Sequence, residues 1–182
     1  MTITDIIPEF PRPVQVDLLP AKISRQTISA EPSECAAVAR RLEIVEVKSL
    51  VAKISLEPLG RTGLIRVNGR LTAEVVQNCV VSLAPISASI EDEFELTFGP
   101  PEAALDESEE IEVSWDSQDP PDPIIDGIID LGEVVVEHLA LALDLFPRAP
   151  EAAFVPPPEL EDIPEVKVNP FAVLANLRQK KD

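Results

Sequence analysis

Two runs of alternating apolar and polar residues lie on either side of a short turn near the middle of the chain. In the run from residue 64 to 78 the odd positions are mostly apolar, and these are Ile65, Val67, Leu71, Ala73 and Val75. In the run from residue 86 to 98 the even positions are apolar, and these are Ile86, Ala88, Ile90, Phe94, Leu96 and Phe98. Only Asp92 departs from the second pattern. A period of two predicts half-buried strands, and the short loop predicts an antiparallel hairpin with one dry face.

More elements are predicted before this hairpin. Residues 45–57 alternate in the same way and predict a third strand, closed by the turn residues 58–63. Glu31-Pro32 and the apolar stripe after it predict a helix, because proline fits the first helical turn. Residues 12–18 and 23–29 are short extended candidates that could begin the sheet. We predict an α+β fold, an antiparallel β-sheet with two packing helices, and leave open whether the sheet curls into a partly open barrel.

The C-terminal half predicts a second helix and then an appendage. Asp130 is an N-cap candidate with Glu133 three residues on, at the spacing of a capping box, and Pro147 is predicted to end the helix. We predict one α+β domain over residues 1–147, with an acidic, partly mobile insert at about 99–127. Residues 148–182 are predicted to form a proline-rich linker and a short basic amphipathic helix from Asn169, which docks either on its own domain or on a partner.

The formal net charge of −18 at pH 7 is concentrated in one segment. Residues 1–99 carry a net charge of −3, residues 100–165 carry −18, and residues 166–182 carry +3. Because nucleic-acid binding depends on lysine and arginine that neutralise phosphates, the acidity of one segment leaves such a role open for the first 99 residues and the tail. The candidate RNA or partner contacts are Arg66, Arg70, Arg40, Arg41, Arg178, Lys180 and Lys181.

Two interpretations stay open for the strand arginines. Arg66 and Arg70 would stand on one side of an extended strand, about 13 Å apart, a spacing that could follow a nucleic-acid backbone. The hairpin would also bring the glutamates of residues 91–95 opposite them, where opposite charges pair. For Arg40 and Arg41 the alternative is a favourable interaction with the C-terminal dipole of the first helix.

Motifs for catalysis or for metal binding are missing from the sequence. It has no glycine-rich phosphate loop, no nucleophile elbow and no Cys-x-x-Cys pair. His138, the only histidine, has no ligand companions and is interpreted as structural. The two cysteines, Cys35 and Cys79, are interpreted as reduced, small buried hydrophobes. We therefore predict a non-enzymatic protein without catalytic residues, metal or cofactor.

Localisation is predicted from what the chain lacks. No apolar run approaches the roughly 18 to 20 residues that span a bilayer, and the first residues lack the pattern of a secretory signal. We therefore expect a soluble, cytoplasmic protein without a membrane partner.

Three motifs in order resemble the YceD family, the large ribosomal RNA subunit accumulation proteins. The first is the turn at Cys79 with the strand before it, whose sequence is similar to the variant found in alphaproteobacterial members. In this turn Val81 and Ser82 stand where relatives carry arginine and a second cysteine. The second is the start of the second helix, and the third is the terminal helix with its basic end. The signature residues of the first two motifs, interpreted as structural, are Cys79, Leu83, Pro85, Asp130, Leu131, Gly132 and Glu133.

The resemblance implies a non-enzymatic factor for accumulation or processing of large-subunit (23S) ribosomal RNA during ribosome assembly. It would bind precursor RNA or the pre-ribosomal particle through residues 1–99 and the basic tail. The second turn cysteine, and the cysteines that many relatives carry after the second helix, are missing, which argues against a zinc or redox role. The alternative is an acidic adaptor that binds a basic ribosomal protein through residues 100–130 without direct RNA contact.

Overall fold

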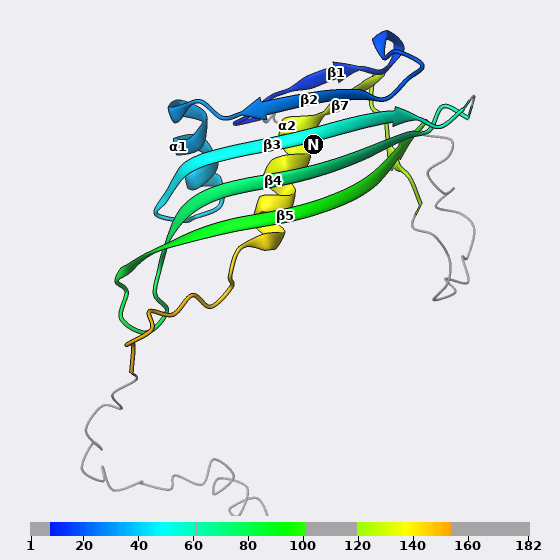
Figure 1. Ribbon diagram of the computed structural model, residues 1–182. Helices are drawn as coiled ribbons and strands as arrows, with labels where there is room; N and C mark the ends of the chain where they lie inside the picture. Colours follow the sequence, from blue (N-terminus) through cyan, green and yellow to red (C-terminus); the bar gives the residue numbers. More distant parts are fainter. Residues whose placement is uncertain (1–7, 61, 101–119, 154–182) are drawn as a thin grey trace, which may run out of the picture. The chain divides into compact units, whose positions relative to one another are not determined.

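A five-stranded sheet in the order β2-β3-β4-β5-β6 is the centre of the fold (Figure 1). The structure is a computed structural model that describes residues 8–60, 62–100 and 120–153. The strands are β2 (Ser24–Ser29), β3 (Glu46–Pro58), β4 (Ile65–Asn78), β5 (Pro85–Gly99) and β6 (Asp122–Pro123). Neighbouring strands from β2 to β5 are antiparallel, and β6 runs parallel to the end of β5. The sheet stays open and is not a barrel, and the predicted α+β class is confirmed.

The central hairpin forms as its alternation predicts. β4 and β5 pair without a shift of register from Ile65↔Phe98 to Asn78↔Pro85. The odd residues of β4 face the core, where Val67 and Leu71 are fully buried. At one core position the hairpin has no side chain on β4, since Gly69 lies opposite Phe94. The Phe94 ring fills that space so closely that a Cβ atom on Gly69 would lie 2.1 Å from it.

Two helices cover the inner face of the sheet. α1 (Pro32–Arg41) packs against β3, and α2 (Leu131–Ala142) crosses behind the long strands (Figure 1). The His138 ring on α2 stacks on Phe94, with 4.2 Å between the ring centroids, and its Nδ1 lies 3.3 Å from Asp92 Oδ2. The single departure from alternation in β5 therefore faces α2, where Asp92 has a polar partner.

The helix boundaries differ from the sequence prediction at one end. α2 ends at Ala142, ahead of Pro147, because Leu143 already has extended backbone angles. The start of α2 is as predicted, since the Asp130 side chain accepts hydrogen bonds from the N–H groups of Gly132 and Glu133. The capping box itself does not close there, because the Glu133 carboxylate contacts Arg41 on α1 instead.

The first extended segment does not join the main sheet. β1 (Pro13–Gln15) pairs antiparallel with β7 (Ile128–Asp130) in a separate two-stranded ladder, and a short 3₁₀ turn (Val16–Leu18) follows β1. Of the two N-terminal candidates, only the segment that includes β2 extends the main sheet. The β1–β7 ladder leads directly into α2 and so fixes the start of that helix.

Several predicted elements lie outside the described residues. These are most of the acidic insert, the terminal helix from Asn169 and most of the proline-rich linker. The division of the chain into a domain and an appendage stays a prediction. Neither helix in the described ranges is long and apolar enough to cross a membrane.

Candidate nucleic-acid interface

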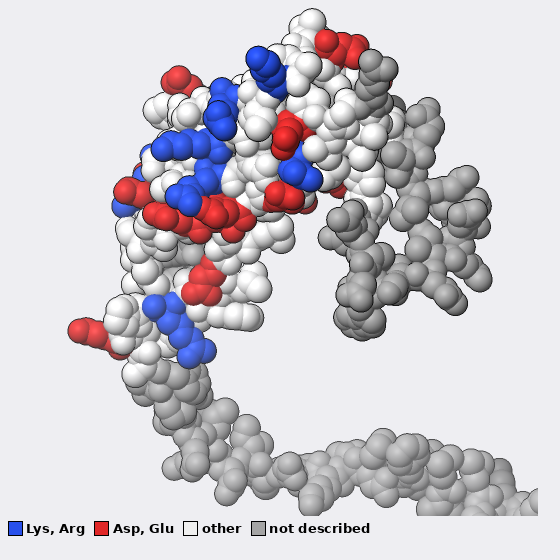
Figure 2. Space-filling model, turned by 45° about the vertical axis from the view of Figure 1, so that its right-hand side comes forward, with Lys and Arg blue, Asp and Glu red and all other residues white. Residues whose placement is uncertain are grey.

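Three cations from neighbouring strands gather on the outer face of the sheet, on the side away from α2. The strand register places Thr27, Lys53, Arg70 and Glu93 in one cross-strand row, and Arg25, Ser55, Asn68 and Glu95 in the next. We call Arg25, Lys53 and Arg70 the basic cluster. Figure 2 shows basic side chains gathered beside a band of acidic ones. The strand pairing alone therefore brings together cations that lie far apart in the sequence.

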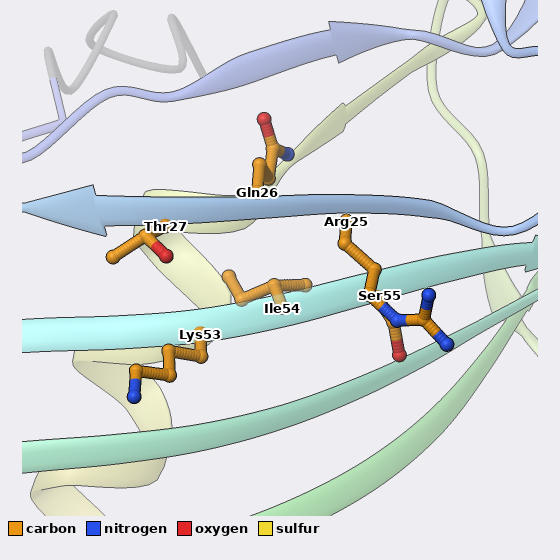
Figure 3. A pocket seen from close by; sticks show the side chains of 6 residues that line it. All are labelled: Arg25, Gln26, Thr27, Lys53, Ile54 and Ser55. Atoms are coloured by element: carbon orange, nitrogen blue, oxygen red, sulfur yellow. The ribbon is translucent and has the colours of Figure 1, made fainter.

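Shallow depressions lie between the side chains of this face. One of about 410 Å³ is lined by Arg25, Thr27, Lys53 and Ser55, among others (Figure 3). A second, of about 460 Å³, extends the surface across Lys53, Asn68 and Arg70. The lining offers guanidinium, ammonium, amide and hydroxyl donors, which are the groups that contact phosphate and sugar oxygens in nucleic-acid complexes.

The predicted pairing across the hairpin is confirmed for the two strand arginines. Arg70 forms an ion pair with Glu93, and the Nε of Arg66 lies 3.5 Å from Glu95 Oε1. Arg66 also lies 3.8 Å from Glu57 on β3. Because Arg70 and Glu93 are each about two-thirds exposed, at 65% and 64%, their pair contributes little to stability and can exchange with another ligand. Whether either arginine contacts RNA stays a prediction.

The two arginines at the end of α1 have different surroundings. Arg41 donates hydrogen bonds to Glu133 on α2 and to Glu9, with 2.7 Å from Nη1 to Glu133 Oε2. These bonds raise the pKa of Arg41 above its ordinary value, and the bond from Arg41 lowers the pKa of Glu133. Arg41 thus links α1 to α2, whereas Arg40 is exposed. The tail candidates Arg178, Lys180 and Lys181 lie outside the described residues.

The turn between β4 and β5 is organised around the sulfur of Cys79, which is fully buried. The sulfur accepts N–H bonds of 3.4 Å from each of Val81, Ser82 and Ala149. Hydrogen bonding from the Ser82 side chain, followed by these N–H groups, lowers the thiol pKa to about 6. Leu83 completes the turn with a left-handed backbone, at a φ of 60°, and is 75% exposed.

Hydrogen bonds fasten this turn to the chain that follows α2. Besides the Ala149 bond to Cys79, the Val80 N–H donates to the Pro147 carbonyl at 2.9 Å. The buried Gln77 side chain donates to the Asp144 carbonyl, also at 2.9 Å. The two signature motifs around Cys79 and Asp130 are therefore connected through the segment after α2, which supports their interpretation as structural.

The second signature motif explains the start of α2 residue by residue. One carboxylate oxygen of Asp130 accepts bonds from the N–H groups of Gly132 and of Arg12, at 2.9 and 2.8 Å. Leu131 is fully buried, and Gly132 lies so close to the N-terminal segment that an added Cβ would be 1.6 Å from the Phe10 carbonyl oxygen. Asp130 thus caps the helix, Leu131 and Gly132 pack it against the N-terminal segment and the core, and the Glu133 carboxylate contacts Arg41.

Metal binding finds no support in the described ranges, where no three His, Cys, Asp or Glu side chains are grouped to hold an ion. Sequence reasoning missed Arg25 and Lys53, although both are exposed on the same face as Arg70 and Lys53 lies directly opposite Arg70. Their only sequence signal is that each occupies a polar position of a predicted strand. The register that joins them across β2, β3 and β4 could not be derived from that signal.

The segment that contains these motifs matches a known protein family. The family described as "Large ribosomal RNA subunit accumulation protein YceD" matches residues 67–178. The chain belongs to the YceD family. The name of this family implies a role in accumulation of the large ribosomal RNA subunit. Searches of curated proteins and of solved structures found no match.

The extent of the YceD match shows which of these features lie inside the family range and which lie before it. It covers most of β4, all of β5 and α2, and with them Arg70 and the signature residues around Cys79 and Asp130. Arg25 and Lys53 lie before the matched range. The basic cluster therefore combines one cation inside the YceD match with two outside it.

Proposed function

We propose that this YceD protein promotes accumulation of the large ribosomal RNA subunit by direct contact with precursor RNA, as a non-enzymatic factor acting in the cytoplasm. The observation that carries the proposal is the basic cluster, three cations on three adjacent strands beside hydroxyl and amide donors. Cations clustered on one surface are the electrostatic footprint of nucleic-acid binding, even in a chain of negative total charge. The basic tail adds a second contact.

The electrostatics of the cluster favour phosphate over a structural role. In the described ranges Arg25 and Lys53 have no acidic partner within ion-pair distance, so no carboxylate there competes with a phosphate for their charges. Arg70 shares its charge with Glu93, but this exposed pair is weak enough for a phosphate to replace the carboxylate. The polar neighbours Thr27, Ser55 and Asn68 can then donate to further backbone oxygens.

Binding of the full chain to a transcript of large-subunit precursor RNA, measured by filter retention across a salt series, tests this proposal. The double variant Arg25→Ala/Lys53→Ala should weaken binding several-fold and reduce the slope of log K against log salt by about one for each lost phosphate contact. Arg148→Ala removes one charge from an exposed site beyond α2 and should change little. The tail variant Lys180→Ala/Lys181→Ala tests the second contact.

Two results would contradict direct contact through the cluster. One is RNA binding that the double variant leaves unchanged, and the other is an equal effect of Arg148→Ala. Absence of RNA binding by the unmodified chain would reject the RNA contact altogether. Circular dichroism of each variant must match that of the unmodified chain, so that a loss of binding reports on charge and not on folding.

A second candidate function is that of an acidic adaptor. The net charge of −18 favours it, together with the glutamate row on β5, where Glu93 and Glu95 are 64% and 63% exposed. Such a protein would bind a basic ribosomal protein by charge complementarity and reach RNA only indirectly. Its signature would be retention of a purified basic ribosomal protein by the chain, in the absence of RNA binding.

A further inference from the structure

In the part of the chain that the structure describes, one long strand of the sheet has an open edge. Within the described ranges, the edge of β5 that faces away from β4 is paired only at Phe98 and Gly99, where β6 lies beside it. Figure 1 shows β5 at the border of the sheet, with β4 on its other side. From Pro85 to Thr97 the described residues leave that border without a neighbouring strand. An open edge presents unpaired backbone donors and acceptors, which can pair with another extended chain.

Two hydrogen bonds show which residues of β5 turn their backbone groups outward. The Gly99 carbonyl accepts from Ile124 N–H at 2.7 Å on the β6 side, so alternate residues back along β5 also face that side. The Leu50 carbonyl accepts from Ala30 N–H toward β2, which turns Lys53 toward β4. Lys53 and Arg70 are paired, so the backbone groups of Arg70 point to β3 and not to β5. Glu93, opposite Arg70, therefore also turns its N–H and carbonyl away from β4, toward the open border. The outward residues are Ser87, Ser89, Glu91, Glu93, Glu95 and Thr97.

An apolar groove lies next to this edge, on the inner side of the sheet. It has a volume of about 560 Å³, and its apolar lining comes from β5, from the segment around β6 and from α2. Two of its hydrophobic residues are largely exposed, Leu141 at 75% and Ile125 at 67%. The main apolar residues of the lining are Leu96, Phe98, Ile125, Ile128, Val134 and Leu141.

Charge decides between the chains that could use this edge. Side chains alternate across a strand, so Glu91, Glu93 and Glu95 point to the outer face while the groove lies on the inner face. Two copies of β5 paired edge to edge would place these carboxylates against one another, which disfavours a dimer of this chain. If another strand with cations on the outer face of the sheet paired with β5, those cations would lie beside the glutamates.

We propose that the open edge of β5 binds an extended protein segment in which lysine or arginine alternates with apolar residues. Backbone groups pair with those of Glu91, Glu93 and Glu95, the cations lie beside the three carboxylates, and the apolar side chains enter the groove. This is recognition by addition of a strand to a sheet. The inference does not depend on RNA contact, and it places the cations of a basic partner beside β5 and not beside the carboxylates of residues 100–130.

The test uses a synthetic octapeptide that alternates lysine with valine, labelled for fluorescence anisotropy, and the full chain. A second peptide has the same composition with the lysines and valines in two blocks, and a third has the alternating sequence with N-methyl groups on its pairing amides. The alternating peptide should bind best. Each of the other two should bind about tenfold more weakly or worse, because one loses the match to the two faces and the other loses backbone hydrogen bonds.

Two variants of the chain match these peptides. Glu93→Pro removes an N–H that points away from β4, so it blocks the added strand and leaves the β4–β5 ladder intact. Glu93→Gln keeps that N–H and removes only the charge. We expect about a tenfold loss of peptide affinity for Glu93→Pro and a smaller, salt-dependent loss for Glu93→Gln. Thermal unfolding of both variants shows whether the sheet is kept.

The outcomes are distinguishable. Equal binding of all three peptides, or peptide binding that Glu93→Pro leaves unchanged, would mean attraction by charge alone and overturn the proposal. No binding to the full chain, or sedimentation showing a dimer that the peptide does not disturb, would also overturn it. RNA binding can succeed or fail independently of every one of these results, since the peptide assay contains no RNA.

Discussion

The sulfur of Cys79 has an unusual set of donors for a buried cysteine. Three N–H groups point at it, two from its own turn and one from Ala149 beyond α2, and the Ser82 side chain adds a fourth bond. Donors of this kind favour the thiolate over the thiol. These hydrogen bonds place partial positive charge around the sulfur, which stabilises the thiolate. The residue thus serves to hold the turn against the chain after α2.

The thiolate should make stability depend on pH. The pKa of Cys79 is lowered to about 6 in the folded protein, whereas a free cysteine has a pKa of about 8.5. A lowered folded-state pKa contributes stability that is complete above the unfolded pKa and is lost as the pH falls through about 6. Urea unfolding midpoints should therefore rise from pH 5.5 to pH 8.5. The rise should be absent in Cys79→Ala. It should be kept in Cys35→Ala, because burial raises the pKa of the Cys35 thiol and this residue does not contribute to the rise.

Gly132 is required by close approach and not by backbone angles. An added Cβ would lie 1.6 Å from the Phe10 carbonyl oxygen, so the N-terminal segment would have to move away from α2. We expect Gly132→Ala to lower the free energy of unfolding by about 1–3 kcal/mol or more, despite the better helix propensity of alanine. Chemical denaturation measures this. Gly127→Ala is the comparison, since Gly127 has a positive φ of 71° but open space around it, and a smaller loss is expected there.

Among the elements, β4, β5 and α2 meet at one aromatic ring, that of Phe94. Phe94 covers Gly69 on β4 and stacks on His138 of α2, so it joins two elements at a point where β4 offers no side chain. Phe94→Ala should cost about 3–5 kcal/mol of unfolding free energy, because it opens a cavity and removes the stack. Phe98→Ala, four residues along the same face but only partly buried, should cost less. Equal losses in thermal unfolding would contradict this account.

The elements could be predicted wherever one face of a strand or helix is buried. β3, β4, β5 and the starts of both helices follow from alternation and capping residues, because burial on one side fixes the side-chain pattern. Asp92 appeared as an error in that pattern, but a second element, α2, supplies its partner. Residues 12–18 are a candidate start of the main sheet by their sequence, but β1 pairs with β7 instead, and a three-residue strand carries too little pattern to identify that partner.

The candidate site was predictable only in part, for the same reason. The pairing of Arg66 and Arg70 with glutamates followed from the hairpin, whose register is set by a short turn. Arg25 and Lys53 were missed because β2 and β3 are joined through α1, and a connection of that length leaves the register undetermined. The open edge of β5 is likewise a property of the whole sheet and not of any one segment.

At the scale of the molecule, the sheet separates two kinds of charge on one face. The basic cluster lies over β2, β3 and β4, and the glutamate row follows β5 at the border. They meet at the pair between Arg70 and Glu93. The total charge of −18 therefore does not describe the surface that a ligand meets, because neighbouring strands present opposite signs within one cross-strand row.

The pair at this border should couple the two proposed ligands with opposite signs. Glu93→Gln frees Arg70 for phosphate and removes a carboxylate from the edge of β5, so it should strengthen binding to precursor RNA and weaken binding of the alternating lysine–valine peptide. A change of a few-fold in each direction is expected at low salt, and both changes should shrink as salt screens the charges. Glu74→Gln removes one charge at a position of β4 that pairs with Ser89, and it serves as the comparison. A shift of both affinities in the same direction would show that the substitution acts through the fold and not through the pair.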